Sequence, residues 1–115
     1  MSSKVSFEGI GEVLATFYAA AGVKAGQAVK LDTEGKAVPC GAGDRFCGVA
    51  VSAGDSCAAV QVSGFARVPC SDATVALGCT ELAADGSGGE KKAGSGAGRE
   101  YLVVEKGTDT ITILM

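Results

Sequence analysis

The stretch that decides the fold is residues 23–68, VKAGQAVKLDTEGKAVPCGAGDRFCGVAVSAGDSCAAVQVSGFARV. Short apolar runs alternate in it with turns built from glycine and aspartate. Residues 58–63 repeat with a period of two, which is typical of a half-buried strand. Gly64 interrupts this run, and a glycine inside a strand pattern marks a bulge or bend. The stretch therefore predicts a continuous antiparallel meander.

The composition places this chain among small all-β domains. Its 115 residues fit a single domain. Thirteen valines favour strands over helices, and 18 glycines fall mostly between the apolar runs, where turns are expected. The net charge is −3, and charged residues of both signs are scattered along the chain. This argues against a nucleic-acid partner. No apolar run is long enough to span a membrane, and the N-terminus lacks a signal core. We therefore expect synthesis in a reducing cytoplasm.

Sequence motifs for catalysis or cofactor binding are missing. There is no histidine, so a Cys-His or Ser-His nucleophile is excluded, and no glycine-rich stretch matches a phosphate-binding motif. We predict no catalytic, cofactor-binding or metal-binding residue, and no enzyme activity. The five cysteines lack a CxxC pair, which leaves two interpretations: small buried apolar residues, which we favour, or a disulfide or metal site assembled through space. They are Cys40, Cys47, Cys57, Cys70 and Cys79.

The N-terminal residues 1–11 are predicted to form an extended arm before a single β-domain of residues 12–115. The arm carries isolated apolar residues, and we select Val5, Phe7 and Ile10 as candidate contacts with a partner. The apolar spacing in residues 10–18 fits both a helix and a strand. We favour the strand, because the stretch has no helix cap and its neighbours are all β.

The C-terminal half contains a glycine-rich segment and two further strands. Residues 85–98 hold six glycines, and they predict either a mobile loop or a hairpin with a long glycine tip. We expect a flexible, dispensable loop. Residues 100–105 and 110–114 are predicted strands. Together with residues 98–99 and 107–109 they echo the pattern of residues 44–63 at an offset of about 54 residues, which predicts two similar β-units packed against each other.

Four short patterns follow one another in this chain: AG-x-x-V at residues 25–29, a turn at Gly35, GD-x-x-x-GVAV at 43–51 and AVQVSGFARVP at 59–69. In these residues the chain resembles the capsid cement, or head decoration, proteins encoded near the major capsid gene of tailed phages and prophages. The resemblance extends over residues 12–115. It consists of apolar alternation and glycines rather than a catalytic signature.

The resemblance implies a small antiparallel β-barrel or β-sandwich of the β-tulip kind. It implies a homotrimer bound to the major capsid protein on the capsid exterior, with the N-terminal arm along the shell. We therefore expect a structural virion protein, made in the cytoplasm of the bacterial host. Two alternatives remain open at this stage: another phage structural module, such as a tail-tube or spike component, or a bacterial ligand-binding β-module.

Overall fold

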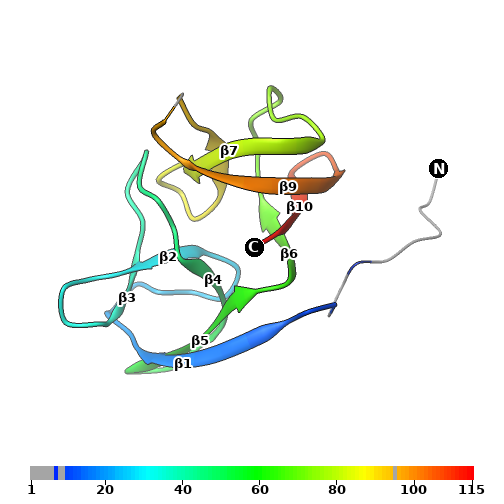
Figure 1. Cartoon of the computed structure of the whole chain (residues 1–115). Helices are drawn as coiled ribbons and strands as arrows, with labels where there is room; N and C mark the ends of the chain where they lie inside the picture. The colour runs from blue at the N-terminus through cyan, green and yellow to red at the C-terminus, as the bar shows by residue number, and fades with distance from the viewer. Residues whose placement is uncertain (1–6, 8–9, 95) are drawn as a thin grey trace.

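The computed structural model describes residue 7, residues 10–94 and residues 96–115, and this part of the chain is all β, as predicted. Ten strands form two antiparallel sheets of five strands each (Figure 1). Neither sheet closes into a barrel, so the sandwich-like architecture is the one observed. The strands are β1 Val13–Tyr18, β2 Ala28–Leu31, β3 Ala37–Pro39, β4 Gly48–Ala53, β5 Cys57–Ser63, β6 Phe65–Pro69, β7 Gly78–Ala84, β8 Glu90–Lys92, β9 Arg99–Lys106 and β10 Thr110–Leu114.

The two halves of the chain have the same topology. The first sheet has the strand order β1-β5-β4-β2-β3, and the second has the order β6-β10-β9-β7-β8. Counted from the first strand of each half, both orders read 1-5-4-2-3. In each half the first strand therefore pairs with the last, and the hairpin of the second and third strands forms the opposite side. The echo seen in the sequence corresponds to this repeat of one five-stranded unit.

The repeat extends to individual turns. In the β2–β3 hairpin, Asp32 Oδ1 accepts two backbone N–H groups of its own turn, each at 2.9 Å. In the β7–β8 hairpin, about 53 residues later, Asp85 Oδ1 accepts two N–H groups in the same way, at 2.6 and 3.1 Å. A side chain that satisfies the N–H groups of a turn fixes its geometry. An aspartate at the equivalent position therefore fixes the turn of each hairpin.

Gly64 joins the two halves. Strand β5 ends at Ser63 and β6 begins at Phe65, so one residue separates strands that belong to different sheets. Gly64 has φ of 91°, and a Cβ at this position would lie 2.5 Å from the backbone of Gly11. Only glycine meets both conditions without strain. The predicted bend at Gly64 is therefore confirmed, and it is the point where the chain passes from one sheet to the other.

Two apolar clusters form the interior, and the larger one joins the halves. The smaller cluster lies within the first half and contains Val23, Val29, Ala37, Ala50, Ala58 and Val60. The larger cluster combines most of the buried residues of the second half with Ala28, Cys40, Phe46 and Val49 of the first. Within it, Phe46 stacks on Tyr101 at 5.0 Å between ring centroids, and the Tyr101 hydroxyl donates to the Phe46 carbonyl at 3.3 Å. The halves therefore share one core.

The glycine-rich segment 85–98 differs from the flexible loop that we expected. It contains β8, which pairs with β7, and the side chain of Glu90 in β8 is fully buried. The carboxylate of Asp72 also accepts the Lys92 N–H at 3.0 Å. The hairpin alternative is thus the correct one for residues 85–92. The glycines allow this order because they permit close contacts: a Cβ at Gly89 would lie 2.5 Å from the carbonyl oxygen of Pro69.

The ambiguous N-terminal stretch is a strand. Residues Val13–Tyr18 form β1, which pairs with β5 over its full length, with an irregularity between Val13 and Leu14. Tertiary pairing decides here between two periodicities that the sequence allows equally. The strand prediction for residues 10–18 is confirmed for the residues of β1.

We expect Gly64→Ala to lower the free energy of unfolding by about 2–4 kcal/mol, because it adds positive-φ strain to a backbone clash. Gly35→Ala is the matched control. Gly35 also has positive φ, 82°, but no atom lies within 4 Å of its Cβ position, so a loss of only about 1 kcal/mol is expected. Urea unfolding of both variants measures the difference. Equal losses would show that the Gly11 contact does not constrain the fold.

Candidate functional site

The three residues predicted as partner contacts have different surroundings. Val5 lies outside the described residues. Ile10 is 53% exposed and is free to meet a partner. Phe7 is half-buried, and its ring lies 5.0 Å from the ring of Phe65 at the start of β6. Phe7 therefore packs on its own domain, and its contact with a partner stays a prediction.

The physical reason for the position of Phe7 is the bend at Gly64. After the bend, Phe65 emerges half-buried beside the N-terminal segment, and its N–H donates to the Ile10 carbonyl at 3.2 Å. The Phe65 ring offers an apolar surface to Phe7, and tilted aromatic pairs at this distance are favourable. The N-terminal segment is therefore anchored to the junction of the two halves at Phe7 and Ile10.

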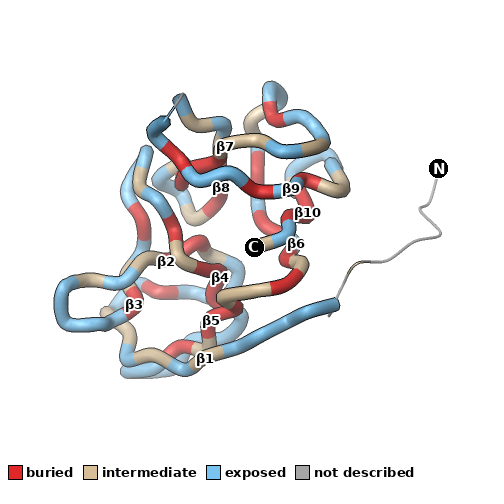
Figure 2. Tube along the Cα trace, viewed as in Figure 1, coloured by how far each residue is buried: buried red, intermediate tan, exposed pale blue. Residues whose placement is uncertain are grey.

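Three exposed apolar side chains near the N-terminus lie on β1. Val13 is 51% exposed, Leu14 48% and Tyr18 72%, and the strand runs along one side of the molecule with most of its length exposed (Figure 2). We call Ile10, Val13, Leu14 and Tyr18 the β1 surface. Sequence analysis selected only Ile10 from this set. The alternation in residues 13–18 indicates a strand, but it does not show that this strand lies at the edge of its sheet.

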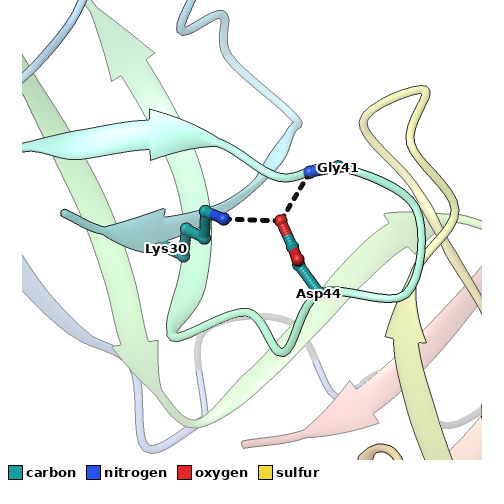
Figure 3. A network of polar contacts seen from close by, with 3 residues as sticks. All are labelled: Lys30, Gly41 and Asp44. Carbon is teal, nitrogen blue, oxygen red and sulfur yellow. Dashed lines mark hydrogen bonds and ion pairs between the residues drawn. The ribbon is translucent and has the colours of Figure 1, made fainter.

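A small polar network ties the loop between β3 and β4 to β2 (Figure 3). Lys30 Nζ donates to Asp44 Oδ2 at 2.6 Å, and the Gly41 N–H donates to the same oxygen at 2.8 Å. The hydrogen bond from Lys30 lowers the pKa of Asp44, and the same bond raises the pKa of Lys30. Both side chains are partly open to solvent, so this pair orients the loop without forming a reactive site.

Three arginines, Arg45, Arg67 and Arg99, lie in different surroundings. Arg45 Nη2 donates to the carbonyl of Gly96 at 3.1 Å, and Arg99 lies over the Tyr101 ring at 5.1 Å from its centroid. Arg67 lines a surface hollow of about 170 Å³ together with residues of β9, β10 and the turn between them. The structure thus gives the three arginines structural contacts in three separate places.

The five cysteines are free thiols, and three of them are deep enough for burial to alter their chemistry. Burial raises the pKa of the Cys40 thiol to about 11, and it also raises the pKa of Cys47 and of Cys70. A thiol with a raised pKa is a poor nucleophile and a poor metal ligand at neutral pH. Among the described residues no group of three or more cysteine or carboxylate side chains could hold a metal ion.

Glu90 is the one chemically unusual side chain within the described range. It is fully buried, and neither carboxylate oxygen has a hydrogen-bond partner. Burial, reinforced by the charge of Asp85, raises its pKa well above the usual range. When charged, Glu90 in turn raises the pKa of three groups from both halves of the chain: Cys40, Cys70 and Tyr101. The repeat explains the burial, because Ala37, which begins β3, is buried at the corresponding position of the first half.

The comparison with known proteins adds no family and no relative to these observations. No protein-family model matches this chain, and no curated protein matches it. In the described residues there is also no helix long and apolar enough to cross a membrane.

Glu90→Gln tests the buried carboxyl. An unfolded glutamate releases its proton near pH 4.5, whereas the folded protein retains it to higher pH. As the pH rises above this value, the wild type should therefore lose stability relative to Glu90→Gln, by up to about 1.4 kcal/mol per pH unit. Urea unfolding between pH 4 and 9 measures the two curves.

The control for this comparison is Glu34→Gln, which removes an exposed carboxylate from the turn of the first half. This variant shows how the loss of one surface carboxylate by itself alters the stability curve. Parallel curves for the wild type and Glu90→Gln would show that Glu90 is already ionised in the folded protein.

Proposed function

We propose that this chain is a head decoration protein of a tailed phage or prophage. It binds the major capsid protein on the outside of the assembled capsid and stabilises the shell. Three copies form one unit, as the resemblance implies. The chain is made in the bacterial cytoplasm and functions in the virion. It performs no chemistry and requires no cofactor.

The observation that carries the proposal is the resemblance, whose quoted patterns lie within residues 25–69. These residues include β2 to β6 and the crossing between the two sheets at Gly64. The glycines quoted for the resemblance occupy structural positions: Gly26, Gly35 and Gly43 have positive φ, and Gly48 approaches the Gln61 carbonyl so closely that a Cβ would lie 2.4 Å from it. The shared pattern therefore coincides with positions that the fold needs.

The surface of the described part supports an adhesive function. Exposed apolar residues gather near the N-terminus, in the β1 surface, close to the contacts that anchor Phe7 and Ile10. Contiguous exposed apolar side chains mark sites of protein–protein contact. A decoration protein needs such contacts because it must add binding area to the shell, and several weak contacts per unit multiply one another.

Co-sedimentation with undecorated capsids assembled from the major capsid protein of the same genome tests the proposal. We expect saturable binding of the intact chain and a capsid that withstands higher temperature. Absence of binding would contradict the decoration role. Rings or fibres of the purified chain alone would favour a tail component instead.

Deletion of residues 1–6 tests the contribution of the N-terminal arm. This variant retains the contact between Phe7 and Phe65, so its melting temperature should equal that of the wild type. We expect its affinity for capsids to fall by about tenfold, because each subunit loses one of its attachment points. The matched variant Ile10→Ser removes an exposed apolar contact from the same region while the chain length stays constant. Unchanged affinity in both variants would remove the arm from the attachment mechanism.

A further inference from the structure

The four strands at the sides of the two sheets are β1, β3, β6 and β8. An edge strand presents unpaired N–H and C=O groups to any other strand, and proteins blunt it with short length, charge or proline. Strand β3 has three residues and ends in Pro39, and β8 has three residues that include Lys91 and Lys92. Strand β6 contains Arg67 and Pro69. Only β1 among them has six residues with neither charge nor proline.

The internal repeat makes β6 a direct reference for β1. Tyr18 and Pro69 each pair with the first residue of the last strand of their half, and Thr16 and Arg67 precede them by two positions. The second half thus places an arginine and a proline where the first half places a threonine and a tyrosine. Edge strand β6 is thus protected against pairing with another strand, whereas the equivalent edge strand β1 is not.

The backbone of β1 shows which groups the open side offers. The Ala19 N–H donates toward β5, to the Ser56 carbonyl at 2.8 Å, and the Ala20 N–H donates to the other side, toward β3, at 3.0 Å. Backbone groups alternate in direction along an antiparallel strand. The even-numbered residues of β1 therefore direct their N–H and C=O groups to the edge away from β5, and their side chains are all exposed. They are Leu14, Thr16 and Tyr18. Strand β3 meets this edge only beyond β1, at an isolated bridge between Ala19 and Ala37.

We propose that β1 is a contact between two copies of this chain, which pair β1 antiparallel with β1 around a twofold axis at Thr16. In this register each Thr16 faces its counterpart, and each Leu14 faces the Tyr18 of the second copy. Threonine pairs and pairs of an aromatic with an aliphatic side chain are favourable across strands. The pattern is complementary to itself, as a twofold contact requires. Because residues 13–18 carry no charge, the pairing opposes no like charges.

This contact is separate from the proposed attachment to a capsid. The contact uses one strand, so it buries less surface than the roughly 800 Å² per partner of a standard interface. We therefore expect a dissociation constant of about 100 μM. It leaves the second sheet available for a threefold contact. On a crowded surface, where the local concentration is high, a contact of this strength would be occupied.

Sedimentation equilibrium between about 10 μM and 1 mM tests the contact. We expect the wild type to dimerise and Thr16→Arg to weaken the dimer by about tenfold, since it brings two like charges face to face. The fold accommodates an arginine at this place, as Arg67 shows in the second half. Thr16→Glu should weaken the dimer equally. Mixing the two variants in equal amounts should restore it, because only a twofold axis at this residue sets opposite charges against each other.

Leu77→Arg is the control. It makes the same charge change at an apolar residue that is 62% exposed and lies between β6 and β7, away from β1. It should leave the dimer unchanged. Amide exchange gives a second readout: dimer formation should protect the N–H groups of Leu14, Thr16 and Tyr18 and leave those of Ala15 and Phe17 as they were.

Three results would overturn the β1 contact. They are a monomer throughout the concentration range, an oligomer that Thr16→Arg does not affect, and a mixture of variants that fails to reassociate. A trimer that is insensitive to Thr16 substitution and still binds capsids would refute this contact and support the decoration role. A dimer with the predicted sensitivity that binds no capsid would do the reverse.

Discussion

The close approach of Gly64 to Gly11 is the constraint on which the arrangement of the two sheets depends. Three segments meet at this point. The N-terminal segment contributes the Ile10 carbonyl to Phe65, the junction turns between the sheets, and the C-terminal Met115 N–H donates to the Gly64 carbonyl at 3.0 Å. A side chain at Gly64 would separate these backbones. The crossing thus fixes the direction of β6 against β5 and also the place where β1 begins.

The repeat is regular in topology and irregular in chemistry. The same hairpin carries buried Ala37 in the first half and buried Glu90 in the second. The same side strand is uncharged in the first half, whereas it carries Arg67 and a proline in the second. The halves therefore share the geometry that the backbone requires, while their side chains differ in the interior and at the sheet edges.

The sequence was sufficient for the features that depend on local chemistry. The strands from the period-two runs, the bend at Gly64 and the echo between the halves were predicted correctly, because strand alternation and positive φ are properties of neighbouring residues. The continuous meander expected for residues 23–68 is wrong, since β2 lies between β3 and β4, and β5 and β6 belong to different sheets. The β8 strand and the burial of Glu90 were missed. A charged residue among glycines indicates a solvated loop, and only pairing with β7 brings it inside. The exposure of β1 was missed for a related reason: strand order in a sheet is set by long-range pairing.

The pairing of the first strand with the last in each half has a consequence during synthesis. As the chain leaves the ribosome, β1 emerges about 45 residues before β5, its only partner strand in the described structure. The first sheet stays incomplete until Ser63 is made, and the cost of closing so long a loop delays the pairing further. The nascent chain therefore holds an apolar, uncharged strand without its partner for most of the translation of its first half.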